Sequence, residues 1–323
     1  MGKYPKHNQN DLIITNLPCF IASDVTEKLE DMFGCLKIKD TLQGNSNFRV
    51  QEITDFLVRN KNLVAISNDN LVWLAKSGER EITQATKTGN VMKTIKTDFV
   101  INDFAVNSSG ELFMSASGTA WIKKLTKDEK FLDVYHIPEG YTAQGLTVTD
   151  DDQIVVCLYQ LFEDSKLVQL NKDGKLQKII QYNLDGTTPL FENPERVCGN
   201  RNGDLIITQP FKNIIILDNQ GKKRSEYNGQ VQCLPKRFNP QCTVTDKLSH
   251  ILVSDYDNST VHLLDKSGNF IQFIKPQTGT FSHPEGMCID KRNKLWICSE
   301  NGSKILVVNY DDNLPAKRVK IDR

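Results

Sequence analysis

The feature that most constrains the fold is a unit of four short strands that recurs along the chain. The stretch Phe238–Ile274 shows the unit most clearly, as apolar runs of four or five residues separated by turns of Gly, Asp, Asn or Ser. Such runs, rich in Val, Ile, Leu and Thr, are typical of β-strands joined by tight turns. One such meander cannot cover both of its faces, so it needs neighbours. The strands expected in this unit are 241–245, 251–254, 260–264 and 270–274.

Two markers repeat with the same period and the same count. Apolar runs assigned to the second strand of each unit begin at Leu63, Leu112, Ile154, Leu205, Ile251 and Leu295, which by subtraction gives spacings of 49, 42, 51, 46 and 44 residues. Turns assigned between the third and fourth strands are Ser77-Gly78, Asp128-Glu129, Asp173-Gly174, Gln220-Gly221, Ser267-Gly268 and Asp311-Asp312. A period of about 40 to 50 residues with four strands per unit is typical of a β-propeller. The sequence therefore predicts an all-β fold, a six-bladed β-propeller.

The N-terminal part of the chain differs from these units. Residues 1–36 are predicted to form a linker with a short helix over Val25–Phe33, because apolar residues there share one face. Asp24 can cap this helix and Gly34 can end it. The propeller is then predicted to span residues 37–323.

Closure of the ring requires one strand from outside the last unit. The sixth unit shows three strands, so its outer strand has to come from elsewhere. The favoured candidate is Ile38–Leu42, within residues 37–43, and the alternative is the C-terminal tail Lys317–Ile321. Either one would leave no open edge between the first and last blades.

Composition restricts the partner and the compartment. Lysine plus arginine and aspartate plus glutamate each number 40, so the formal net charge is zero and no global field favours nucleic acid or a membrane surface. No apolar run approaches ~18 residues, and the first ten residues are too polar for a signal peptide. We therefore expect a cytoplasmic protein without a membrane partner.

Cysteine and histidine spacing argues against a metal centre. The eight cysteines are scattered, none forms a C-x-x-C pair, and only five histidines are present. A structural zinc site needs four thiolates or imidazoles, usually at close paired spacings. We expect no metal and no cofactor. Cysteines within apolar strands, such as Cys157 and Cys298, are expected to be buried reduced thiols.

Motifs in the later units resemble a known family. Pro284–Asp290 followed by Lys294–Cys298 resembles an NHL repeat. Thr245–Phe270 is similar to the propeller of bivalve tripartite-motif proteins of the NHL type, and so is Asn193–Val197. The first two units match weakly, since Asn102-Asp103-Phe104 replaces the usual Pro-x-Gly at the start of a unit.

The resemblance implies a recognition role. Full-length relatives carry a RING, B-boxes and a coiled coil ahead of the propeller, but this sequence has no cysteine/histidine framework and no heptad run. The resemblance therefore implies the substrate-recognition or adaptor module of a tripartite-motif ubiquitin-ligase-like system, with a protein partner and no enzyme activity of its own. Without a coiled coil, we expect no oligomer.

Strand order assigns the loops to two faces of the ring. Aromatic and Arg side chains at a concave propeller mouth have the composition of a binding surface, and those expected to bind the partner are Phe191, Arg196, Phe211, Lys212, Tyr256 and His283. The opposite face carries basic hairpin turns, which would hold phosphates if the partner were RNA: Lys222, Lys223, Arg224, Lys291 and Arg292. RNA binding is the first alternative function.

A catalytic reading is the second alternative. Six-bladed propellers include calcium-dependent lactonases with carboxylates at the central channel, and Pro284-Glu285-Gly286 partly resembles a lactonase signature. Asp150–Asp152 and Asp255–Asn258 are calcium candidates, although both fall where polar turns are expected. No catalytic residue is predicted, because Ser, His and Asp scattered over a ring carry no spacing information. This alternative is a lactonase-like, metal-dependent hydrolase.

Overall fold

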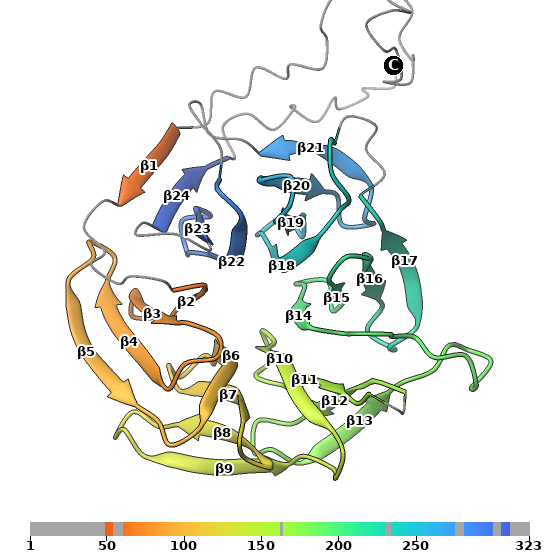
Figure 1. Cartoon of the computed structure of the whole chain (residues 1–323), viewed down its shortest axis with the longest axis horizontal. Coiled ribbons are helices and arrows are strands. Elements are labelled where there is room, and N and C mark those ends of the chain that lie inside the picture. The colour runs from red at the N-terminus through yellow and green to blue at the C-terminus, as the bar shows by residue number, and fades with distance from the viewer. Residues whose placement is uncertain are drawn as a thin grey trace, which may run out of the picture.

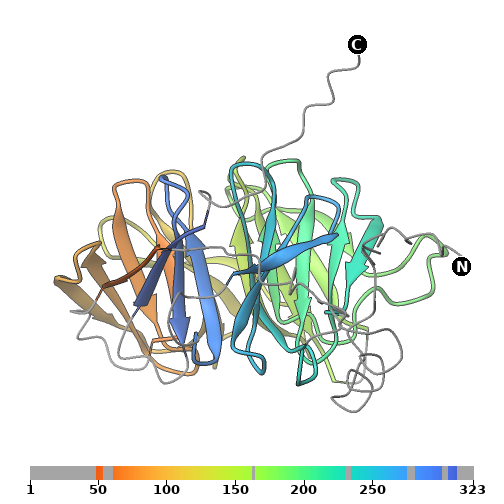
Figure 2. The same cartoon turned by 90° about the horizontal axis from the view of Figure 1, so that it is seen from above.

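Six four-stranded antiparallel sheets form the blades of a propeller around one axis (Figure 1). The computed structural model describes residues 49–53, 61–161, 164–229, 234–274, 281–299 and 305–310. Figure 2 shows the ring from the side, with the turns gathered at its two faces. The prediction of an all-β, six-bladed propeller is confirmed. The described ranges contain no helix and so none long and apolar enough to cross a membrane; the predicted helix Val25–Phe33 lies outside them.

The strands of each blade run from the axis outward. Blade 1 contains β2 (Leu63–Ile66), β3 (Leu71–Ala75), β4 (Glu81–Thr86) and β5 (Val91–Lys96). Blade 2 contains β6 (Val100–Val106), β7 (Leu112–Ser117), β8 (Trp121–Leu125) and β9 (Phe131–His136). Blade 3 contains β10 (Thr142–Val148), β11 (Ile154–Tyr159), β12 (Lys166–Leu170) and β13 (Leu176–Ile180).

The remaining blades repeat this order. Blade 4 contains β14 (Arg196–Gly199), β15 (Leu205–Gln209), β16 (Asn213–Leu217) and β17 (Lys223–Tyr227). Blade 5 contains β18 (Pro240–Thr245), β19 (Ile251–Asp255), β20 (Thr260–Leu264) and β21 (Phe270–Ile274). Blade 6 contains β22 (Pro284–Ile289), β23 (Leu295–Ser299), β24 (Ile305–Asn309) and, on the outside, β1 (Arg49–Ile53).

The core lies between the blades. Each hydrophobic cluster joins two neighbouring sheets, as where Phe113 and Ile122 of blade 2 pack with Val156 and Leu158 of blade 3. Equivalent clusters occupy the other five junctions. Because each sheet is covered on both faces, a middle strand such as β16 is buried along its whole length.

The first hairpin of every blade has the same local geometry. One turn residue has a positive φ, at Asn70, Gly110, Asp152, Gly203, Ser249 and Asn293. A polar side chain at the start of the turn holds the loop: Asp246 Oδ1, for example, accepts the backbone N–H groups of Leu248 and His250, each at 2.8 Å. Asp, Asn, Ser and Thr stabilise turns in this way, which explains why such residues separate the apolar runs in the sequence.

The ring is closed by β1. This strand pairs antiparallel with β24, from Arg49 opposite Asn309 to Ile53 opposite Ile305. It occupies the place that the sequence assigned to Ile38–Leu42, a segment outside the described residues, as is the alternative tail Lys317–Ile321.

Closure by β1 also corrects the strand assignment in the first unit. The run at Leu63 is the inner strand β2 and not a second strand, which is β3 and begins at Leu71. The spacing to the second strand at Leu112 is therefore 41 residues (112 minus 71) instead of 49. The turn Ser77-Gly78 accordingly joins the second and third strands of blade 1.

Candidate functional site in the central channel

The inner strands are irregular beside the axis. Register shifts occur in β6, β10, β18 and β22 where each pairs with its second strand. Bulges of this kind re-aim side chains and are common near functional sites. By register with the second strand, the equivalent inner-strand residues of blades 2 to 6 are Asp103, Gly145, Arg196, Cys242 and Gly286. The two charged members of this set lie on different blades.

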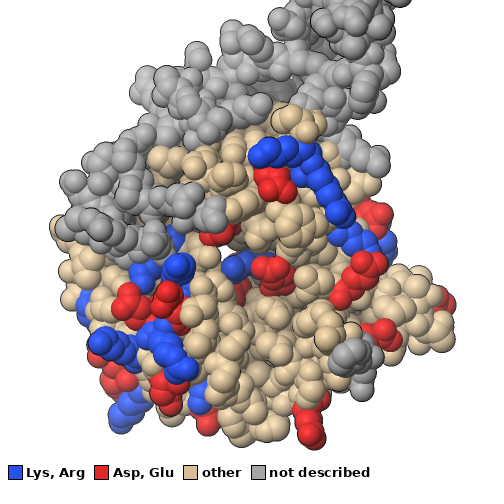
Figure 3. All heavy atoms as spheres, viewed as in Figure 1, with Lys and Arg blue, Asp and Glu red and all other residues tan. Residues whose placement is uncertain are grey.

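Asp103 and Arg196 form an ion pair between blades 2 and 4. Arg196 Nη1 donates to Asp103 Oδ1 at 2.7 Å, and the backbone N–H of Leu146 donates to Asp103 Oδ2 at 3.1 Å. The two side chains are only 12% (Asp103) and 17% (Arg196) exposed. Figure 3 shows the molecule hollowed at the centre of the ring, with acidic and basic side chains beside the hollow.

Burial and mutual charge set the protonation of this cluster. Burial raises the pKa of Asp103, against the opposing effect of the Arg196 charge. Burial also raises the pKa of Glu195 above its ordinary value of 4.5, while Arg196 lowers it and Asp103 raises it. Burial opposes the charge of Arg196, but the negative charges of Asp103 and other neighbours outweigh this effect, and its pKa is raised. The channel thus holds a permanent cation, Arg196, beside two carboxyl groups whose pKa values are raised.

Backbone contacts between blades hold the cluster in place. The N–H of Gly145 donates to the carbonyl oxygen of Glu195 at 2.7 Å. A Cβ at position 145 would lie 2.4 Å from that oxygen, so only glycine permits this approach. Ser115 Oγ donates to the carbonyl of Gln144, and Ser254 Oγ makes the same contact with Glu285 at 3.2 Å. The inner strands are therefore fixed relative to one another at the depth of the charged cluster.

Buried thiols surround the charged groups. Cys157 and Cys242 are buried and reduced, and burial raises the pKa of both. They are neutral at physiological pH and pack as small apolar groups. Cys298 is also buried and reduced, so the expectation for Cys157 and Cys298 is confirmed.

In each of the two calcium candidates, a carboxylate accepts hydrogen bonds from other groups of the protein. Asp151 accepts from Thr149 Oγ1 at 2.6 Å and from Gln153 Nε2 at 2.6 Å. Asp255 is fully buried and accepts from Asn258 Nδ2 at 2.8 Å and from the N–H of Asn239 at 3.2 Å. Among the residues that the structure describes, no group of three or more His, Cys, Asp or Glu side chains could hold a metal ion. The carboxylates of Asp151 and Asp255 are thus held by protein donors.

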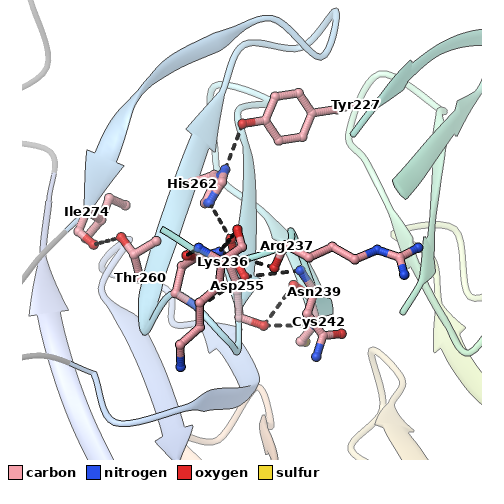
Figure 4. Close-up of polar contacts among 11 residues, drawn as sticks. Tyr227, Lys236, Arg237, Asn239, Cys242, Asp255, Thr260, His262 and Ile274 are labelled. Carbon is pink, nitrogen blue, oxygen red and sulfur yellow. Dashed lines mark hydrogen bonds and ion pairs between the residues drawn. The ribbon is translucent and has the colours of Figure 1, made fainter. Parts of the chain in front are cut away.

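A buried Tyr–His–Asp chain in blades 4 and 5 is structural. Tyr227 Oη lies 2.7 Å from His262 Nδ1, and His262 Nε2 lies 3.2 Å from Asp255 Oδ2 (Figure 4). His262 and Asp255 have no exposed surface, so a substrate cannot touch them. The chain joins β17 to β19 and β20 across the junction of two blades.

The residues predicted to form a binding face are not all on a surface. The structure corrects the prediction that Phe191 is on the binding face. Phe191 is only 3% exposed and packs in the core between blades 3 and 4. Arg196 lies in the channel. Phe211 is 52% exposed and has a positive φ, Lys212 pairs with Glu192, and the rings of Tyr256 and His283 have centroids 4.6 Å apart. Partner recognition through these residues stays a prediction.

The basic turns do not form one patch. Lys222, Lys223 and Arg224 lie at the start of β17 in blade 4, where Lys223 pairs with Glu226 at 2.6 Å and Arg224 pairs with Asp204. Lys291 and Arg292 lie between β22 and β23 in blade 6, and Lys291 Nζ donates to the carbonyl of Asn68 at 2.6 Å. The sequence placed both groups on the same face and in different units, but it could not show that some of these side chains are already partnered.

Comparison with known proteins supports the fold alone. No protein-family model matches the sequence, and no curated protein matches it. Solved structures do match. Virginiamycin B lyase from Staphylococcus aureus has 14% identity and a TM-score of 0.57 over 81% of this chain and 99% of its own. A gluconolactonase from Xanthomonas campestris has 15% identity and a TM-score of 0.60 over 81% and 89%. A luciferin-regenerating enzyme has 8% identity and a TM-score of 0.64 over 81% and 95%.

These matches correct one expectation. The sequence was taken to encode a propeller without enzyme activity, but the solved propellers that it resembles include a lyase and a gluconolactonase. The structural comparisons give the tripartite-motif resemblance no support beyond the shared six-bladed propeller. The channel cluster, which the sequence analysis did not predict, is the candidate functional site because of its buried ion pair and raised carboxyl pKa values.

Proposed function

We propose that the protein is a hydrolase that opens a small lactone or ester in its central channel. The observation that carries the proposal is the buried cluster of Asp103, Glu195 and Arg196, contributed by inner strands and the segments that lead into them. Ligand sites are commonly concave, with a few convergent polar groups. Carboxyl groups with raised pKa values in such places are candidates for acid–base chemistry.

The roles follow from charge and protonation. Arg196 stays positively charged and supplies donors for a carbonyl oxygen that becomes negative as the reaction proceeds. Glu195, in its carboxylate form, accepts a proton from water while the water oxygen bonds to the carbonyl carbon. The tetrahedral intermediate then breaks the carbon–oxygen bond of the ester, and the leaving oxygen takes the proton from Glu195. Asp103 is a positioning residue, since it holds Arg196 through the 2.7 Å contact.

The experiment measures base consumption at constant pH with a panel of hydroxy-acid lactones and matched linear esters. We expect hydrolysis of at least one lactone, and a loss of about a hundredfold or more in kcat for Glu195→Gln. Glu192→Gln is the matched control, because Glu192 is on the same segment but its side chain is 75% exposed, and this variant should keep full activity. A chelator should leave the rate unchanged, because Glu195 and Arg196 act in the proposed mechanism without a metal.

The outcomes are separable by product analysis. Hydroxy acid formed by the wild type and lost in Glu195→Gln supports the proposal. An unsaturated acid, formed by elimination, would exclude hydrolysis. Equal rates for the wild type and Glu195→Gln, or no turnover of any lactone or ester, would overturn the assignment of the channel as a hydrolytic site.

A further inference from the structure

A second candidate site lies on the outer rim, between blades 3 and 4. A cleft of about 890 Å³ runs between residues 178–186 and residues 220–225. One wall is the end of β13 and the segment after it, which projects beyond the rim of the ring in Figure 1. The other wall is the turn that leads into β17 and the start of that strand. The cleft is therefore built from the outermost strands of blades 3 and 4, whereas the channel cluster is built at the inner strands of blades 2 and 4.

The cleft has an unusually apolar wall for a surface site. Ile179 is 51% exposed and Leu184 is 81% exposed, and both line the cleft. Tyr182, in the same lining, is 39% exposed. Exposed apolar side chains that line one groove favour the binding of another apolar group.

The lining is also positively charged. It contains Lys178, Lys222, Lys223 and Arg224 but only one acidic residue, Asp185. The Asp185 carboxylate accepts from the loop's own Thr187 and Thr188. Lys223 and Arg224 pair with carboxylates outside the lining. No ion pair joins Lys178 or Lys222 within the part of the chain that the structure describes, and Lys178 Nζ is held across the cleft by the carbonyl of Gln220 at 2.6 Å.

The backbone of β13 offers a third kind of contact. This strand is the outermost of blade 3, so in the described part of the chain no strand pairs with its outer edge. An exposed strand edge presents N–H and C=O groups that an extended peptide can pair with. Side chains of a strand alternate between two sides, so an added peptide with alternating residues would present apolar groups on one side and acids on the other.

We propose that this cleft binds an extended acidic peptide segment of a partner protein, added as a fifth strand along β13. Its apolar side chains lie against Ile179 and Leu184, and its carboxylates face Lys178 and Lys222. RNA fits less well, because two of the four basic side chains are already ion-paired and the exposed wall is largely aliphatic, whereas single-stranded RNA is bound by stacking on aromatic rings.

The test is a selection from a displayed library of random peptides of about ten residues, long enough for one strand. Wild-type protein is the bait, and the double variant Lys178→Glu with Lys222→Glu is used for counter-selection. We expect enriched peptides that alternate Asp or Glu with Leu, Ile or Phe. Synthetic copies should bind the double variant at least about tenfold more weakly than the wild type, given ~1.4 kcal/mol per tenfold change in Kd.

Matched variants keep the result interpretable. Lys291→Glu with Arg292→Glu makes the same charge change on blade 6 and should leave binding unchanged. Leu184→Asp, at an 81% exposed position that cannot unfold the ring, should also weaken binding. The proposal is overturned if no acidic peptide is enriched or if both charge variants lose binding equally. It is also overturned if an oligouridine RNA binds the cleft and the peptides do not. None of these results depends on channel activity.

Discussion

At the scale of single residues, the first hairpin of each blade shows how strongly one backbone angle constrains the sequence. The turn position with a positive φ is Gly in blades 2 and 4 and Asn in blades 1 and 6. These residues adopt that conformation at low cost. Ser249 in blade 5, with φ at 64°, is a less suitable residue for the same geometry. The six turns therefore form an internal series for measuring the cost.

A reciprocal exchange measures this cost directly. Ser249→Gly should raise the free energy of unfolding by about 0.5–1 kcal/mol, because glycine removes the strain of a side chain at positive φ. Gly203→Ser should lower it by about 1 kcal/mol, because it introduces that strain. Chemical denaturation of the two variants and the wild type measures both changes. Shifts of the same sign would show that backbone strain does not control these turns.

The sequence predicted the turns, and it named Arg196 as a binding residue, but it did not predict the channel cluster. Turn chemistry is local, so Asp246 and its neighbours could be recognised without a fold. Asp103 and Arg196 are 93 positions apart and meet only because β6 and β14 both border the axis. One signal was available: Asp103 and Arg196 occupy the position that is Gly in blades 3 and 6 and Cys in blade 5. Phe191 was misjudged because a loop aromatic can equally turn into the junction between blades, and sequence spacing does not distinguish the two.

At the scale of strands, the approach of β10 to the segment before β14 positions the channel cluster. Gly145 makes this approach possible through its 2.7 Å hydrogen bond to the carbonyl of Glu195. The residue whose carbonyl accepts this bond, Glu195, is itself a member of the cluster, and Arg196 follows it directly in the chain. The close packing of β10 on this segment therefore also fixes where the charged side chains lie.

Replacing this glycine should affect stability and site geometry together. In Gly145→Ala the methyl group would meet backbone atoms of Glu195 and Arg196 at 2.4 and 2.7 Å, so the strands must separate. We expect a loss of about 1–3 kcal/mol, as for other overpacked positions. Gly199→Ala is the control, because its nearest neighbour is a side-chain methyl of Thr149 at 3.1 Å. Equal destabilisation of the two variants by thermal unfolding would contradict the close-approach argument.

The closing strand β1 can be tested by comparing two deletions. Removing residues 1–43 keeps β1, whereas removing residues 1–53 also removes the strand that pairs with β24. The longer deletion should melt at a lower temperature than the shorter one, because it exposes the edge of β24 and opens the ring. Equal melting temperatures would mean that this pairing does not stabilise the propeller.

At the scale of the whole molecule, the ring explains both why the fold was predictable and why the function was not. A propeller repeats one meander, and each hydrophobic cluster joins only neighbouring blades, so periodic local signals are sufficient to identify it. Function depends on where the repeats differ. The channel cluster results from charged replacements in blades 2 and 4, and the rim cleft results from the projecting segment between β13 and β14. Blade 4 thus contributes to both sites, with its inner strand at the channel and its outer strand at the rim.

The most direct test of the channel as an acid–base site is the dependence of kcat/KM on pH for the lactone that is hydrolysed fastest. Glu195 must be deprotonated to act as a base, and its pKa is raised by burial, so the acidic limb for the wild type should have its midpoint above 4.5. Asp103→Asn removes a charge that raises this pKa and should move the limb to lower pH. Arg196→Gln removes a charge that lowers it and should move the limb to higher pH. Opposite shifts in the two variants are the predicted result, and an acidic limb that is identical in all three proteins would contradict the assignment of Glu195.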